Sequence, residues 1–164
     1  MGAHSNLGVF SASQEIIATA ASTSTVDMAQ AVNQYGVSGN LWLCIRVAVA
    51  PTVATDTIAI ILQTDADDGA GDPAGTWYTV FAPFCGMAGD ALAEVLVSDS
   101  RLDAAGDWVY RAPVPMEMLE RHVRLYYLNE TASTGTQTYD AWLNDGPPQS
   151  DFDKQIYVSP VGNP

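Results

Sequence analysis

The sequence contains few basic residues. Six lysines and arginines stand against 19 aspartates and glutamates, which gives a formal net charge of −13 over 164 residues. A chain this acidic repels the phosphates of nucleic acids, so we expect no direct binding to DNA or RNA. The same repulsion disfavours binding to an anionic membrane surface. High net charge favours solubility and carries no information about the fold.

Long apolar runs and targeting segments are also lacking. The longest apolar stretch, LWLCIRVAVA, has ten residues and contains Arg46, whereas a membrane-spanning helix needs about 20. The N-terminus shows no basic region followed by an apolar one, so no secretory signal is expected. Cys44 and Cys85 form no CxxC pair. We interpret them as buried free thiols, with a disulfide as the alternative.

Residues that carry catalysis are scarce. The chain has two histidines, His4 and His122, which are too few for a histidine metal centre. His122 lies in an alternating run, where a surface or inter-strand position is expected. No G-x-S-x-G, Walker or G-x-G-x-x-G motif occurs. A glycoside hydrolase needs a pair of carboxylates, but 19 acidic residues make a chance pair certain, so such a pair is no evidence for this activity. A glycoside hydrolase is therefore the weakest hypothesis. We therefore predict no enzymatic activity, no catalytic residues and no cofactor.

Apolar residues, in contrast, make up 48% of the chain and mostly alternate with polar ones. Alternation is typical of β-strands that bury one face. Nine such runs are separated by turn residues, at 14–20, 24–29, 41–49, 57–63, 76–82, 107–112, 121–128, 136–143 and 154–158. Helical spacing is confined to 87–97 and one turn after Pro115. The sequence predicts an all-β fold, an antiparallel jelly-roll-like β-sandwich of about eight or nine strands.

The two ends differ in composition from the middle. We predict an N-terminal arm at 1–13, a β-sandwich domain at 14–144, and a proline-rich C-terminal arm with one short strand at 145–164. The arms are interpreted either as frayed termini or as segments that dock on a neighbouring chain. The second interpretation makes their apolar residues the candidate partner contacts: Leu7, Val9, Phe10, Phe152, Ile156 and Tyr157.

The segment LQTDADDGAGDPAGTWY, residues 62–78, is the main candidate for a ligand site. Asp65, Asp67, Asp68 and Asp72 are weak candidate metal ligands, because flexible oxygen ligands suit Ca²⁺. An EF-hand needs glycine at its sixth position and a carboxylate at its twelfth; counting from Asp65, these are Ala70 and Thr76. Turn formation alone also explains Asp and Gly between two strands. The alternatives are an acidic connector and a carbohydrate- or receptor-binding module, Ca²⁺-dependent through the 65–72 loop next to Trp77.

The order of the segments resembles one protein family. VFSASQEIIATAASTSTVDM is followed by IILQTDAD, GTWYTVF and RHVRLYYLNETASTGTQTYDAWL, and then by a proline-containing tail. This order is similar to that of the capsid cement, or decoration, proteins of short-tailed phages of the Bordetella phage type. The similarity covers nearly the whole chain, but it rests on strand and turn patterns and no single motif is specific.

The resemblance implies a jelly-roll-like fold without enzymatic activity, and a structural virion protein on the capsid exterior that is made in the host cytoplasm. It also implies binding to the major capsid protein, cementing neighbouring subunits and stabilising the shell. Self-association is expected, with a dimer favoured over a trimer. Relative to the pattern, this chain has a longer aspartate-rich insert at 65–75, which we expect to alter a loop and not the fold.

Overall fold

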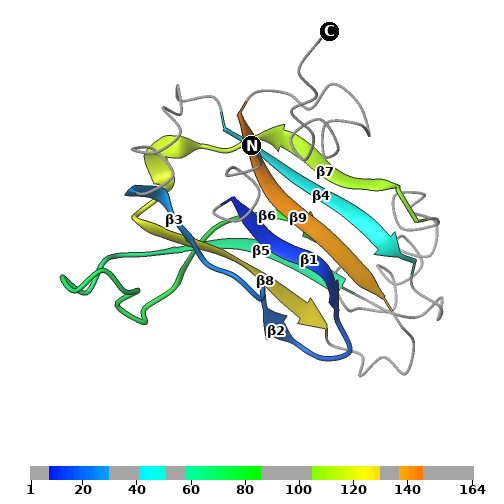
Figure 1. Cartoon of the computed structure of the whole chain (residues 1–164), viewed down its shortest axis with the longest axis horizontal. Helices are drawn as coiled ribbons and strands as arrows, with labels where there is room; N and C mark the ends of the chain where they lie inside the picture. The colour runs from blue at the N-terminus through cyan, green and yellow to red at the C-terminus, as the bar shows by residue number, and fades with distance from the viewer. Residues whose placement is uncertain (1–7, 30–40, 51–57, 86–104, 130–136, 146–164) are drawn as a thin grey trace, which may run out of the picture.

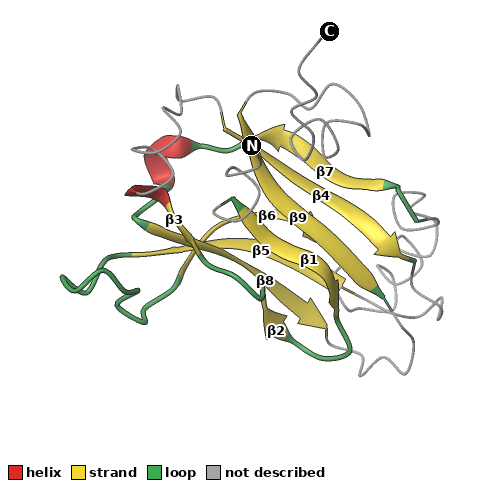
Figure 2. Ribbon diagram, viewed as in Figure 1, coloured by secondary structure: helices red, strands yellow, loops and turns green. Residues whose placement is uncertain are grey.

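The chain folds as an all-β, antiparallel β-sandwich. The structure, a computed structural model, describes residues 8–29, 41–50, 58–85, 105–129 and 137–145. The described residues form nine strands in two sheets that pack face to face (Figures 1 and 2). Their bounds are β1 Val9–Glu15, β2 Ala20–Ala21, β3 Val26–Asp27, β4 Leu41–Val49, β5 Ile58–Asp65, β6 Tyr78–Cys85, β7 Trp108–Pro113, β8 His122–Asn129 and β9 Thr138–Asp145.

The strand order is that of one long antiparallel ribbon rolled onto itself. Along the ribbon β5 pairs with β6, β4 with β7, β2 and β3 with β8, and β1 with β9. Rolling then brings β4 against β9 and β5 against β8. The two sheets therefore read β1-β9-β4-β7 and β2-β8-β5-β6, which is the jelly-roll arrangement. The predicted fold class is confirmed, and the β5–β6 connection is the turn at the tip of the ribbon.

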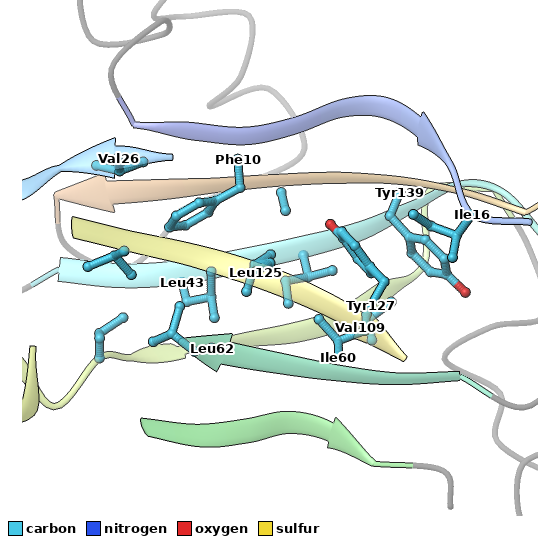
Figure 3. Close-up of a cluster of buried hydrophobic side chains, with 14 of the residues drawn as sticks. Phe10, Ile16, Val26, Leu43, Ile60, Leu62, Val109, Leu125, Tyr127 and Tyr139 are labelled. Atoms are coloured by element: carbon cyan, nitrogen blue, oxygen red, sulfur yellow. The ribbon is translucent and has the colours of Figure 1, made fainter. Parts of the chain in front are cut away.

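Period-two alternation produces the core. On β4, Leu41, Leu43, Ile45 and Val47 are buried, whereas Val49 at the strand end is 43% exposed. On β8 the alternate residues Val123, Leu125 and Tyr127 are fully buried. Figure 3 shows Leu43 of β4 and Leu125 and Tyr127 of β8 between the two sheets, together with Ile60 and Leu62 of β5 and Phe10 of β1. Because burial of each large apolar side chain contributes about 1.5–3 kcal/mol, this layer supplies most of the driving force for folding.

Two tyrosines lie within this apolar layer. The rings of Tyr127 and Tyr139 stack with centroids 5.9 Å apart (Figure 3). Their hydroxyls have polar partners: Tyr127 Oη lies 2.9 Å from Ser11 Oγ, and Tyr139 Oη donates to Gln137 Oε1 at 2.9 Å. Burial raises the pKa of Tyr127, so this phenol stays protonated. Satisfied hydroxyls are what allow such side chains to occupy a core.

The N-terminal boundary of the sandwich differs from the prediction. Residues 9–13 were expected in an arm, but they belong to β1, which pairs with β9. Phe10 is 0% exposed and points into the core (Figure 3). A bulge at Ser13, whose φ is +49°, breaks the alternation, and its N–H donates to Asp140 Oδ1 at 2.8 Å. The arm prediction is therefore wrong for residues 9–13, because a bulge and small polar residues obscured the strand pattern.

The remaining expectations were met in part. The run at 107–112 corresponds to β7, and the single turn after Pro115 is a 3-10 helix at Met116–Met118. The runs at 14–20 and 24–29 contain only the ends of β1 and β2 and the short β3. The helical spacing at 87–97 and the strand at 154–158 lie outside the described residues. Asp145, which was assigned to the C-terminal arm, ends β9.

Candidate functional site

Residues 66–77 connect β5 to β6 and extend beyond the end of the sheets as a narrow excursion (Figure 1). We call this segment the acidic hairpin. It continues the antiparallel pairing of its flanking strands through an isolated bridge between Asp67 and Pro73. The N–H of Ala74 donates to the Ala66 carbonyl at 2.9 Å, and that of Asp68 to the Asp72 carbonyl at 2.9 Å. The segment is thus an ordered hairpin at the tip of the rolled ribbon.

Asp68 and two glycines form the turn of the hairpin. The Asp68 carboxylate accepts the backbone N–H groups of Ala70, at 2.7 Å, and Asp72, at 3.2 Å. These two bonds, that from Ala70 first, lower the pKa of Asp68 below its ordinary value. Gly69 and Gly71 have φ of +90° and +107°, values that side chains disfavour. Turn formation therefore accounts for this part of the sequence.

Asp65 stabilises the base of the acidic hairpin. Its side chain is 1% exposed although it stands at the end of β5. Oδ2 accepts the backbone N–H of Gly75 at 2.6 Å, across the hairpin. A buried carboxylate needs such a donor, because desolvation of a charge without a partner is costly. Asp65 is therefore a structural residue that joins the two strands of the hairpin.

Asp67 is held by an arginine from another part of the sheet. Arg121 Nη1 lies 2.9 Å from Asp67 Oδ2, and Arg121 Nη2 lies 3.0 Å from Asp27 Oδ2. The Nε of Arg121 also donates to Asp27 Oδ1 at 3.1 Å, and these contacts with Asp27 and Asp67 raise the pKa of Arg121. A Cβ at Gly71 would meet Arg121 Nη2 at 3.8 Å, so the turn also approaches this guanidinium. The guanidinium lies between two carboxylates and supplies the positive charge at this position.

His122 belongs to the same cluster. Its Nε2 is 3.5 Å from Asp67 Oδ1. On the sheet it stands between two acidic neighbours, Asp65 of β5 and Asp27 of β3. The side chain is 3% exposed, so the expected surface position is wrong and the inter-strand alternative is right. The cause is the acidic hairpin: strand alternation directs His122 outward, and the hairpin residue Asp67 places its carboxylate against the imidazole ring.

The four candidate metal ligands are thus not brought together as a ligand set. Asp65 and Asp68 accept backbone N–H groups, Asp67 pairs with Arg121, and Asp72 is exposed at the turn. Within the described ranges, which include the whole hairpin, no group of three His, Cys, Asp or Glu side chains is placed to hold a metal ion. Backbone N–H groups already bind the carboxylates of Asp65 and Asp68, and Arg121 already binds that of Asp67.

A second arrangement lies beside the base of the hairpin, on the outer face of the β2-β8-β5-β6 sheet. The Cζ of Arg124 lies 4.0 Å from the ring centroid of Trp77 and 5.7 Å from that of Tyr126. The Nε of Arg124 donates to Gln63 Oε1 at 2.9 Å. Burial lowers the pKa of Arg124. We call Trp77, Arg124 and Tyr126 the Arg124 row.

Sequence reasoning missed this row because its members are far apart in the chain. Arg124 and Tyr126 occupy alternate, outward positions of β8, and the outward assignment itself was available from the sequence. The position of Trp77 over Arg124 depends on the hairpin, which returns the chain to β6 beside β5. Trp77 is half-buried on the outer face of the sheet.

The other three tryptophans lie on the opposite side of the sandwich. Trp42, Trp108 and Trp142 occupy outward positions of the β1-β9-β4-β7 sheet and are half-buried. The rings of Trp108 and Trp142 are 5.7 Å apart. Cys44, directly opposite Trp142 in the ladder, has 0% exposure. These tryptophans thus lie on the outer face of the sheet, beside the buried Cys44, and do not fill the core between the two sheets.

The structure places two of the six predicted partner contacts, Val9 and Phe10. Phe10 is a core residue, so its assignment as a partner contact is wrong. Val9 is half-buried at the start of β1. Leu7, Phe152, Ile156 and Tyr157 lie outside the described residues.

Comparison with known proteins assigns no family. No family model matches this chain, and no curated protein sequence matches it. A search of the described residues finds no helix with the length and apolar character needed to cross a membrane.

Proposed function

We propose that this chain is a structural virion protein that binds the outer surface of a phage capsid and cements neighbouring major capsid subunits. The observation that carries the proposal is the placement of the resembling segments on the rolled ribbon. VFSASQEIIATAASTSTVDM spans β1 to β3, IILQTDAD and GTWYTVF flank the hairpin tip, and RHVRLYYLNETASTGTQTYDAWL spans β8 and β9. The resemblance therefore follows the paired strands of one jelly roll and is not confined to one motif.

The edges of the two sheets favour docking through faces and chain ends. β1 and β6, which end the strand orders, each contain two register shifts, and β6 also contains Pro83. β7 contains one register shift and ends at Pro113. Bulges and prolines obstruct the addition of a further strand. We therefore propose attachment through side chains and terminal segments, with many weak contacts summing to high avidity on a repetitive shell.

Charge also agrees with an exterior position. A chain with a net charge of −13 would be repelled by packaged DNA. On the outside of a shell the same charge keeps the free protein soluble before assembly. We propose that the assembling unit is a homo-oligomer, a dimer rather than a trimer, and that its partner is the major capsid protein.

The proposal is tested by a truncation that leaves the sandwich intact. A chain that ends at Asp145 keeps every described strand and lacks residues 146–164. We expect it to fold with an unchanged circular dichroism spectrum and to occupy fewer sites on capsids assembled from the major capsid protein encoded in the same genome, as measured by co-sedimentation. Full occupancy by the truncated chain would exclude the C-terminal segment as an anchor. Failure of the intact chain to co-sediment would contradict the proposed function.

The second candidate function is a carbohydrate- or receptor-binding β-sandwich module, and the Arg124 row is the observation that favours it. Dependence on Ca²⁺ through residues 65–72 has less support, because backbone N–H groups and Arg121 already engage Asp65, Asp67 and Asp68. A rise in melting temperature with millimolar Ca²⁺ would restore that possibility, since a ligand that binds only the native state stabilises it.

A further inference from the structure

Arg124 and Gln63 present hydrogen-bond donors that find no acceptor among the described residues. Arginine has donors only, so the oxygen of the Gln63 amide faces Arg124 Nε and its NH₂ group faces elsewhere. The two Nη groups of Arg124 take part in no hydrogen bond or ion pair within the described part of the chain. Although the protein has 19 acidic residues, the half-buried Arg124 has no carboxylate in ion-pair contact among the described residues.

The surface around Arg124 is partly aromatic. Trp77 covers one side of the guanidinium at 4.0 Å, and the ring of Tyr126 lies 5.7 Å from it. In the ladder, Tyr126 is flanked by Ala21 of β2 and Ile61 of β5, whose side chains share its outward direction. The row therefore combines a charged donor group with a strip of apolar contact area. The contacts with the rings of Trp77 and Tyr126 and the bond to Gln63 also hold the guanidinium in position before any ligand binds.

We propose that the Arg124 row binds a sugar ring that carries one carboxylate, as in a uronic acid. The carboxylate accepts paired N–H groups from Arg124 Nη1 and Nη2. The C–H face of the sugar stacks on the aromatic rings, and a ring hydroxyl accepts from the Gln63 NH₂ group. The arriving carboxylate supplies the directly bonded partner that the Nη groups lack within the described residues, where Asp65 acts on Arg124 only through Coulomb attraction.

The charge around the row selects against more highly charged ligands. Asp65, Asp67, Asp68 and Asp72 all lie in the adjoining hairpin or at its base, within a chain of net charge −13. An acidic peptide brings several negative charges into this field, whereas a uronate brings one on an otherwise neutral ring. The short-range bidentate contact then outweighs a repulsion that is screened over about 8 Å at physiological ionic strength.

This inference is independent of the proposed capsid function. It concerns the free protein, so it is tested without capsids, and neither result bears on co-sedimentation. The probe is methyl β-glucuronide, followed by ¹H–¹⁵N spectra that include the indole N–H of Trp77. The comparison ligands are methyl β-glucoside, acetate and a tetraglutamate peptide.

We expect methyl β-glucuronide to shift the Trp77 signal and to bind at least about tenfold more tightly than the glucoside or acetate, the size expected for a hydrogen-bonded charge pair. Arg124→Gln should abolish this preference, and Arg124→Lys should weaken it because lysine lacks the planar fork. Arg111→Gln is the matched control: Arg111 lies 5.2 Å from the Trp108 ring on the other sheet, and its loss should leave binding unchanged.

Several results would overturn the proposal. Equal binding of glucuronide and glucoside would remove the role of the carboxylate, and equal binding of acetate would reduce the site to a general anion site. Tighter binding of tetraglutamate would make it a protein contact. Unchanged binding in Arg124→Lys would contradict the paired contact from the planar guanidinium, even if the Arg124→Gln variant failed to fold. The absence of any shift with the glucuronide would exclude the site.

Discussion

The apolar layer between the sheets and the acidic hairpin are held in place by different forces. The layer consists of fully buried aliphatic and aromatic side chains such as Leu43, Leu125 and Phe10. The acidic hairpin contains no large apolar residue between Ala66 and Thr76. Its position depends on Asp65, on the Asp68 turn and on the pairing of Asp67 with Arg121. Charge screening by salt does not weaken apolar burial, whereas it weakens an ion pair such as Asp67–Arg121, whose side chains are 27% and 33% exposed. The core should therefore withstand conditions that release the hairpin.

The largest effect is expected from Phe10→Ala. Phe10 is fully buried in the layer, so its truncation should lower the free energy of unfolding by about 3–5 kcal/mol, as measured by urea denaturation. If Phe10 instead served mainly as a partner contact, the variant would keep the stability of the natural chain and lose only binding. That result would contradict its place in the core.

Two adjacent isoleucines give a matched test of the core boundary. Ile16 is 0% exposed and Ile17 is 58% exposed. Ile16→Ala should cost about 2–5 kcal/mol in the free energy of unfolding, while Ile17→Ala should change it by no more than about 0.5 kcal/mol. Similar losses for both variants in urea denaturation would show that the chain after β1 packs differently.

A smaller and more local effect is expected from Arg121→Gln. The substitution removes the cation between Asp27 and Asp67, so amide exchange should accelerate severalfold in residues 66–76 while the amides of β4 and β9 keep their protection. In the natural chain, 1 M NaCl should produce part of the same change because salt screens the pairs. Arg111→Gln is the control, since Arg111 lies on the opposite sheet and makes no contact with the hairpin within the described residues. Unchanged exchange in Arg121→Gln would mean that backbone pairing alone positions the hairpin.

The smallest effect concerns pH. The folded-state pKa of Asp68 lies below its ordinary value of 3.8, chiefly because of the N–H of Ala70. The Asp68 carboxylate therefore stabilises the turn at neutral pH, and this contribution is lost as the pH falls through the lowered pKa. A carboxyl ¹³C titration should give a midpoint below 3.8 for Asp68, and Asp68→Ala should speed exchange of the Ala70 amide at pH 7. A midpoint at or above the ordinary value would contradict the observed turn.

The same contrast explains what could be predicted from the sequence. Alternation is a local property, so it correctly indicated the strands that form β4, β5 and β8 and, with them, the sandwich. The alternating runs on either side correctly indicated a connector within residues 62–78. The strand through Phe10 was missed because the bulge at Ser13 interrupts its pattern. The burial of His122 and the contact between Arg124 and Trp77 depend on which strands become neighbours when the ribbon rolls. Spacing along the chain does not encode such long-range contacts.

The central functional proposal is tested most directly by a cryo-electron microscopy reconstruction of capsids from the phage that encodes this chain. The proposal predicts density for the two sheets of the jelly roll on the outer surface, in contact with at least two neighbouring major capsid subunits. Absence of this density from the capsid exterior, or its location inside the shell or in the tail, would contradict the proposal.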